Sequence, residues 1–87
     1  MNGRTRKKLS LCKEGDSARI AGITGSGAFK KRLLEMGIVK GAKLTIIRYA
    51  PLRDPMAIEI KGSHLSLRVC EAENIEVEDV SELNSKE

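Results

Sequence analysis

The sequence predicts a mainly β protein, a small antiparallel barrel of about five short strands with one inserted short α-helix. Short runs in which apolar and polar residues alternate recur along the chain and are separated by turn residues. One segment has the helical spacing of apolar residues instead. The chain has 87 residues, which allows one modest hydrophobic core. A closed barrel suits so small a sheet, because closure leaves no exposed strand edges.

The first two strands are predicted before the helix. Leu9 and Leu11 alternate with polar neighbours, so we expect them to anchor a short strand. A turn at residues 13–16 leads into a strand predicted over residues 17–24. The apolar pattern of that strand changes phase beside Gly22, which predicts a β-bulge there.

One helix is predicted, over residues 26–36. Ser26 is placed to accept hydrogen bonds from the first free backbone amides. Three apolar residues share one face at spacing i, i+4 and i+7: Phe29, Leu33 and Met36. Gly37 follows, at the position where a left-handed residue commonly ends a helix. Three helical turns are marginally stable alone, so the apolar face must pack against the sheet.

The middle of the chain returns to the period of a strand. Strands are predicted over residues 44–49 and 56–61, and in the second the apolar and polar residues alternate without a break. Pro51 and Pro55 make the intervening loop, residues 50–55, rigid.

A hairpin and a last strand complete the predicted barrel. Gly62-Ser63 is typical of a two-residue primed turn between strands. We expect the next strand over residues 65–69, a short turn of at most one helical turn at 71–74, and a final strand over 75–78.

Three segments follow from composition. Residues 1–8 (MNGRTRKK) are polar and basic and are expected to form a disordered leader. Residues 9–80 are expected to form the barrel domain. Residues 81–87 (SELNSKE) are expected to be a disordered tail.

The charges argue against nucleic acid as a partner. The net charge is +4, but cations crowd the first eight residues and carboxylates crowd the end of the chain. Strong binding to phosphates needs the positive charge gathered on one surface. Aromatic residues make up 2% of the chain, which leaves no platform for stacking bases.

The sequence predicts a cytoplasmic protein without membrane insertion. No apolar run approaches the roughly 18 residues that span a bilayer. The basic start is followed by charged residues rather than by the apolar core of a secretory signal. Cys12 and Cys70 are too few and too far apart for a disulfide framework, so we expect both thiols to be reduced.

Enzymatic chemistry has few candidate residues. His64, the single histidine, is expected on the exposed face of its strand. A pair formed by Cys70 and His64 stays open, but nothing in the pattern supports it. Gly25-Ser26-Gly27 resembles the start of a phosphate-binding loop but lacks the Gly-Lys-Ser/Thr ending. We therefore predict a non-enzymatic barrel with no catalytic residues, no cofactor and no metal site.

Three motifs in order resemble the FeoA family. The most specific is RLLEMGIVKG at residues 32–41, which is similar to the family's Arg-Leu-x-x-(Leu/Met)-Gly-(Ile/Leu)-x-x-Gly signature. Ala-Pro followed by Asp-Pro within residues 50–55 is the second motif. The third is Gly62 followed by LRVCEA at residues 67–72. The resemblance extends over about residues 9–78.

The resemblance implies an SH3-like barrel and a role in ferrous iron uptake. FeoA proteins are small cytosolic proteins encoded with the FeoB-type ferrous iron transporter, whose cytosolic part includes a GTP-binding domain. The resemblance thus implies an adaptor or regulator that binds this transporter and does not itself need to hold iron. Whether it modulates GTP hydrolysis, transport or assembly stays open, as does weak self-association.

Two surfaces are candidates for the partner contact. The helix offers Lys30, Lys31, Arg32 and Leu34, and the loop offers Pro51, Leu52, Arg53 and Asp54. Small barrels commonly bind partners through loops and exposed grooves. The alternatives are that Leu34 packs at the edge of the core and that the loop is a stiff turn without a function.

Two other functions are weighed beside the adaptor. The same barrel resembles the C-terminal module of iron- and manganese-dependent transcription repressors, and a free-standing copy would bind a regulator or DNA. A winged-helix half is missing from this sequence. A metallochaperone would require Cys12, His64, Cys70 or the acidic end to converge, which is a poor ligand set.

Overall fold

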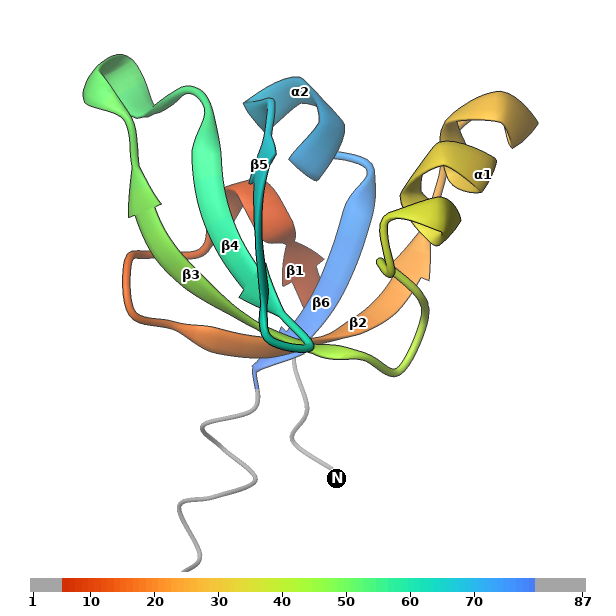
Figure 1. Ribbon diagram of the computed structural model, residues 1–87, viewed down its shortest axis with the longest axis horizontal. Helices are drawn as coiled ribbons and strands as arrows, with labels where there is room; N and C mark the ends of the chain where they lie inside the picture. The colour runs from red at the N-terminus through yellow and green to blue at the C-terminus, as the bar shows by residue number, and fades with distance from the viewer. Residues whose placement is uncertain (1–5, 80–87) are drawn as a thin grey trace, which may run out of the picture.

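The structure, a computed structural model, describes residues 6–79. Six antiparallel strands, one more than the roughly five predicted, form one sheet in the order β1-β6-β2-β3-β4-β5, and the sheet curls into a small barrel (Figure 1). Within residues 6–79 the edge strands β1 and β5 do not pair, so the predicted closure is incomplete. The strands are β1 (Arg6–Lys8), β2 (Ser17–Ile23), β3 (Lys43–Tyr49), β4 (Met56–Ile60), β5 (Ser63–Leu67) and β6 (Ile75–Asp79). The α-helices are α1 (Gly27–Glu35) and α2 (Val69–Ala72), and the 3-10 turns are η1 (Leu9–Leu11) and η2 (Pro51–Arg53).

The core is aliphatic, as the sequence predicts. The alternation is complete in β4, where buried and half-buried residues alternate, and it is broken in β2, where two consecutive residues at the bulge are buried. The largest fully buried side chains are Leu9, Ile20, Leu33, Ile38, Leu44, Ile46, Met56, Ile58, Ile60, Leu67, Ile75 and Val77. Phe29 and Tyr49 lie at the margin of this core and pack against it.

The helix prediction is confirmed in its cap, its apolar face and its end. The Ser26 hydroxyl accepts a hydrogen bond from the Phe29 amide at 3.1 Å. Leu33 is fully buried, and Phe29 and Met36 pack partly buried against the core. Gly37 has a φ of +90°, the left-handed conformation expected after the last turn. The predicted bulge in β2 is also present, as a register shift between Ile20 and Gly22.

The prediction that residues 1–8 are disordered is wrong for residues 6–8, and residues 1–5 and 80–87 lie outside the described range. Arg6–Lys8 forms β1, which pairs antiparallel with β6. Arg6 faces Glu78 and Lys8 faces Glu76 across the pair, so opposite charges stabilise it. Composition alone favours disorder here, because it does not show the strand that supplies the backbone partners.

The prediction of a strand at Leu9 and Leu11 is also wrong. These residues form the 3-10 turn η1, which the Cys12 amide closes by donating to the Leu9 carbonyl at 3.0 Å. The turn buries Leu9 completely and leaves Leu11 63% exposed. An alternating pair of leucines therefore corresponds to one inward and one outward side chain of a turn.

The hairpin and the segment after it begin earlier than predicted. The turn residues are Lys61 and Gly62, which both have positive φ, rather than Gly62 and Ser63. Val69 belongs to α2 and not to the preceding strand, so the predicted turn at 71–74 is mostly the end of this short helix.

The fold places its helices and its hairpin turn at opposite ends of the barrel. η2, α1 and α2 lie at the upper end in Figure 1, and η1, drawn lower, contacts η2 and α2; we call the end formed by these four elements the crown. The β4–β5 turn and the start of β3 lie at the lower end, which we call the base. Within residues 6–79, no helix is long and apolar enough to cross a membrane.

Candidate interaction surface

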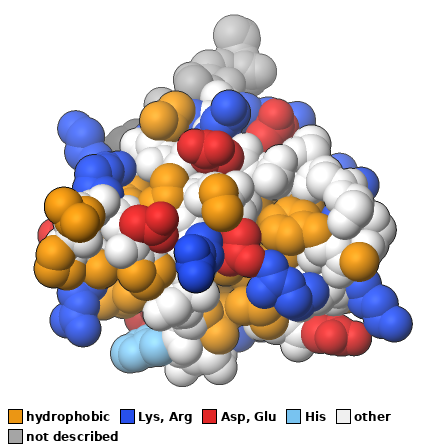
Figure 2. Space-filling model, turned by 90° about the horizontal axis from the view of Figure 1, so that it is seen from above, with side chains coloured by type: hydrophobic (Ala, Val, Ile, Leu, Met, Phe, Trp, Pro, Cys, Tyr) orange, Lys and Arg blue, Asp and Glu red, His pale blue; other side chains and the backbone are white. Residues whose placement is uncertain are grey.

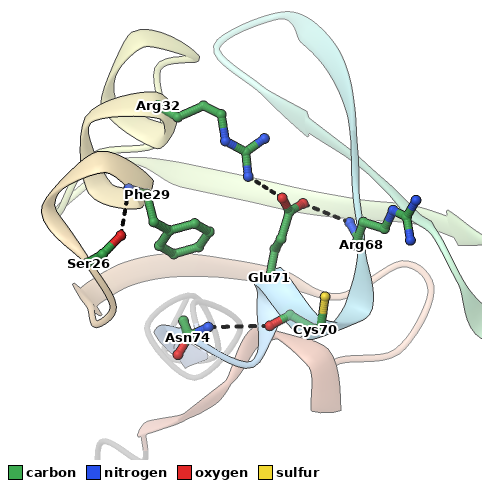
Figure 3. Close-up of polar contacts among 7 residues, drawn as sticks. All are labelled: Ser26, Phe29, Arg32, Arg68, Cys70, Glu71 and Asn74. Atoms are coloured by element: carbon green, nitrogen blue, oxygen red, sulfur yellow. Dashed lines mark hydrogen bonds and ion pairs between the residues drawn. The ribbon is translucent and has the colours of Figure 1, made fainter.

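One ion pair connects the two helices of the crown. The Arg32 guanidinium on α1 donates a hydrogen bond to the Glu71 carboxylate on α2 (Figure 3). The guanidinium also lies 5.8 Å from the centre of the Phe29 ring on its own helix. Arg32, predicted to contact a partner, is therefore already engaged within the molecule, and it positions α1 beside α2.

Glu71 supports α2 as well as receiving Arg32. Its second oxygen accepts a hydrogen bond from the Arg68 backbone amide at 3.0 Å, at the start of the helix (Figure 3). The Arg32 hydrogen bond, helped by the one from Arg68, lowers the pKa of Glu71 below its usual value against the opposing effect of partial burial. Glu71 is thus a carboxylate across the physiological pH range.

The proline-containing loop contacts the same helix. The Asp54 carboxylate accepts a hydrogen bond from the Val69 amide at 3.1 Å, and so satisfies a free donor at the start of α2. Leu52, Asp54, Pro55 and Arg68 line an open hollow between the loop and the helix. Asp54 therefore has a structural role that its position in a loop does not reveal.

Tyr49 and Arg53 attach the loop to η1. The Arg53 guanidinium stacks 4.1 Å from the centre of the Tyr49 ring and donates to the Ser10 carbonyl at 3.4 Å. The Tyr49 hydroxyl donates to the carbonyls of Ser10 and Cys12, and burial raises its pKa above the usual value. Through these contacts the crown becomes one connected surface, from η1 through η2 and α2 to α1.

Three large apolar side chains of the crown point into solvent. Leu52 is 98% exposed, Leu11 63% and Leu34 60%. The crown seen from above shows apolar side chains interspersed with basic and acidic ones (Figure 2). Leu52 and Arg53 also have positive φ, +70° and +65°, in which non-glycine residues are strained. The loop thus combines a strained backbone with an apolar side chain that is almost fully in water.

The structure thus brings the two predicted surfaces together at one end of the barrel. Lys30 and Lys31 are exposed, as expected, and the alternative that Leu34 packs at the core edge is wrong. The sequence prediction missed Glu71, Arg68 and Leu11. Glu71 lies three residues after Arg68, the residue that caps the start of α2. A glutamate at that spacing is a sequence signal for the start of a helix, and it could have indicated α2.

Histidine and cysteine are not gathered into a site. Cys12 is buried in the core, Cys70 is exposed on α2, and His64 lines a separate hollow on the outer face of β3, β4 and β5. No group of three or more histidine, cysteine, aspartate or glutamate side chains among the described residues could hold a metal ion. The convergence that a metallochaperone requires is absent from that part of the chain.

A family model matches nearly all of the barrel. The model is that of the FeoA domain, and it matches residues 7–79, from β1 to the end of β6. The chain belongs to the FeoA family. The match includes β1 and α2, so the elements that sequence patterns missed belong to the shared domain.

The relatives of this FeoA domain include a fusion protein and free-standing structures. It is 46% identical over 74 residues to a Fe(2+) transport protein A/Fe(2+) transporter FeoB fusion protein of Porphyromonas gingivalis, covering 85% of this chain and 9% of that protein. The FeoA protein of Chlorobium tepidum is 40% identical with a TM-score of 0.81, over 85% of this chain and 70% of the other. FeoA of Stenotrophomonas maltophilia in complex with zinc, described as a prokaryotic SH3 domain protein, is 25% identical with a TM-score of 0.70. The match covers 82% of this chain and 88% of the other. The SH3-like barrel is thereby confirmed.

A manganese-dependent transcriptional repressor shares the fold. The TM-score is 0.80 at 18% identity, over 91% of this chain and 44% of the repressor. At this identity the likeness concerns the barrel alone.

Proposed function

We propose that this FeoA domain is a non-enzymatic adaptor of ferrous iron uptake that binds the cytosolic, GTP-binding part of a FeoB-type transporter through its crown. The observation that carries this proposal is the relative in which an FeoA part and a FeoB transporter part belong to one polypeptide. Fusion holds two domains at a high effective concentration, which benefits domains that work in contact. The proposal places the protein in the cytoplasm, at the membrane surface.

The crown has the features that a protein contact requires. Leu34 and Leu52 offer apolar surface that loses its contact with water when a partner covers it. Lys30 and Lys31 lie exposed beside Leu34 and add positive charge at the rim. The Arg32–Glu71 ion pair and the Asp54 cap hold the contributing elements in a fixed arrangement, so little ordering is needed on binding.

A pull-down from detergent-solubilised membranes that contain the transporter tests the proposal. The tagged chain should retain the transporter at low and at physiological salt. Leu34→Ala and Leu52→Ala should each lower the affinity by about 1 kcal/mol or more, as truncation of a central contact residue does. Ile47→Ala is the matched control, because Ile47 is an exposed apolar residue on the outer face of β3, away from the crown.

Two outcomes would contradict the proposal. Loss of the transporter on Ile47→Ala, with retention by the two leucine variants, would move the contact to the sheet face. Retention of DNA or a soluble regulator in place of the transporter would favour the repressor-module function. DNA binding would be recognised by its steep loss with rising salt.

A further inference from the structure

Several basic residues that are distant in the sequence lie close together at the base of the barrel. Across the outer face of the sheet, Arg6 lies opposite Glu78, Glu78 opposite Arg19, and Arg19 opposite Lys43. Ile60 pairs with Leu44 on the next strand. Lys61 comes directly after Ile60, and it therefore lies beside Lys43 at the end of the row. Residues far apart in the chain thus form one row of charges across neighbouring strands of the sheet.

A further lysine lies beside this row. The Arg19 guanidinium donates to the Gly41 carbonyl at 3.1 Å, which holds the loop after α1 against β2. Lys40 precedes that glycine and is exposed. We call the four cations Arg19, Lys40, Lys43 and Lys61 the basic row; Arg6, which pairs with Glu78 at 3.4 Å, borders it.

Two features of the basic row are unfavourable for the isolated domain, the pairing of Arg19 with Lys43 and the backbone of Lys61. Arg19 and Lys43 are like charges on directly opposite residues, an arrangement that destabilises a strand pair. Neither of them forms an ion pair with a side chain of the described range. Lys61 has a φ of +53° in the hairpin turn, where asparagine or glycine is the usual residue. Like charges set side by side against these local preferences favour an anionic ligand, which would relieve their repulsion.

We propose that the basic row binds the anionic headgroups of a phospholipid bilayer surface. The four cations come from a strand, a loop, a second strand and a turn, and the two hollows described above lie elsewhere. Exposed cations spread over several elements suit an extended layer of headgroups better than a single peptide segment. Juxtamembrane cations bind anionic leaflets in this way.

The proposed lipid contact is independent of the crown. The basic row and the crown lie at opposite ends of the barrel, so a transporter and a lipid surface can be bound at the same time (Figure 1). The lipid contact orients the crown away from the bilayer, toward a cytosolic domain. The test of this inference uses protein and lipid without the transporter, so its failure leaves the proposed function standing.

Co-sedimentation with vesicles tests the inference on the full chain. Vesicles of phosphatidylglycerol and phosphatidylcholine in equal parts should bind the protein, and vesicles of phosphatidylcholine alone should not. Binding should weaken as salt rises, because the cations are exposed. Arg19→Gln/Lys43→Gln should weaken binding roughly tenfold to thirtyfold, given the usual contribution of a cation near an anionic surface.

The matched control removes the same two charges elsewhere. Lys13→Gln/Arg48→Gln replaces one lysine and one arginine that are exposed and lie outside both the basic row and the crown. It should bind vesicles as the unchanged protein does. If the Arg19/Lys43 variant is misfolded by circular dichroism, Lys40→Gln/Lys61→Asn tests the same row, since asparagine tolerates positive φ.

Three results would overturn the inference. Equal losses in the control and the basic-row variant would show that net charge, and not this row, governs binding. Equal binding to neutral vesicles would exclude headgroup recognition. Tighter binding to duplex DNA or to a polyglutamate peptide than to anionic vesicles at physiological salt would assign the row to another ligand.

Discussion

Glu71 joins two helices through the two oxygens of one carboxylate. One oxygen receives Arg32 from α1 and the other receives the Arg68 amide at the start of α2. The Arg32 side chain is half exposed, so water and salt weaken the ion pair. Each of the two contacts is therefore expected to contribute a modest share of the stabilisation.

Glu71→Gln should lower the free energy of unfolding by about 1 kcal/mol, because an amide replaces a charged acceptor at a helix start. Glu73→Gln is the control, since its exposed side chain makes no hydrogen bond or ion pair within residues 6–79. Urea denaturation of both variants measures the difference. Equal stabilities of the two variants would show that the Glu71 contacts contribute nothing.

The pH dependence of stability follows from the lowered pKa of Glu71. A carboxyl whose folded-state pKa is depressed stabilises the fold above its unfolded pKa, about 4.3 for glutamate, and loses that contribution as pH falls through the folded value. The stability gap between the unchanged protein and Glu71→Gln should therefore be full at neutral pH and shrink in acid. A gap that is constant between neutral pH and pH of about 3 would contradict this account.

Leu52 combines a strained backbone with an almost fully exposed side chain. Leu52→Asn should raise the free energy of unfolding by about 0.5–1 kcal/mol, because asparagine adopts positive φ at lower cost and no buried surface is lost. The same change should weaken transporter binding. Thermal denaturation and the pull-down measure the two effects, and a loss of stability would show that Leu52 makes packing contacts that its exposure hides.

At the scale of elements, two neighbouring leucines of α1 lie in different environments. Leu33 is fully buried and Leu34 is 60% exposed. Leu33→Ala should therefore cost about 2–5 kcal/mol of unfolding free energy, and Leu34→Ala less than about 0.5 kcal/mol. Chemical denaturation distinguishes the two, and comparable costs would mean that the helix is rotated from the orientation described here.

The elements that the sequence predicts are those specified by nearby residues. Helix α1 carries its cap, its apolar face and its terminal glycine within a dozen residues, and β4 carries its own alternation. By contrast, β1 depends on β6 at the other end of the chain, and Asp54 of another loop supplies part of the cap of α2. Local patterns do not contain such distant partners.

The same reason limits prediction of the site. The sequence indicated Leu34 and Leu52 as candidate contact residues, in a helix flank and a proline-bounded loop, and left open whether Leu34 packs at the core edge. That the two surfaces join depends on Glu71, which connects α1 to α2 only in the folded chain. The basic row likewise arises from strand register, which sets Arg19 beside Lys43.

At the scale of the whole molecule, the barrel separates two surfaces of different chemistry. The crown combines exposed leucines with the Arg32–Glu71 ion pair, and the base carries the basic row. The aliphatic core between them is continuous, so the domain is expected to hold the two ends in a constant relation. This arrangement suits an adaptor that contacts a partner at one end.

Chemical-shift mapping tests the central claim, contact through the crown, most directly. The isotopically labelled chain would be titrated with the purified cytosolic part of a FeoB-type transporter. We expect the amide signals of Leu11, Leu34, Leu52 and Arg53 to shift or broaden first, with little change at Lys43 and His64. Shifts centred on the outer face of β3 to β5, or no shifts at all at saturating concentration, would contradict the account.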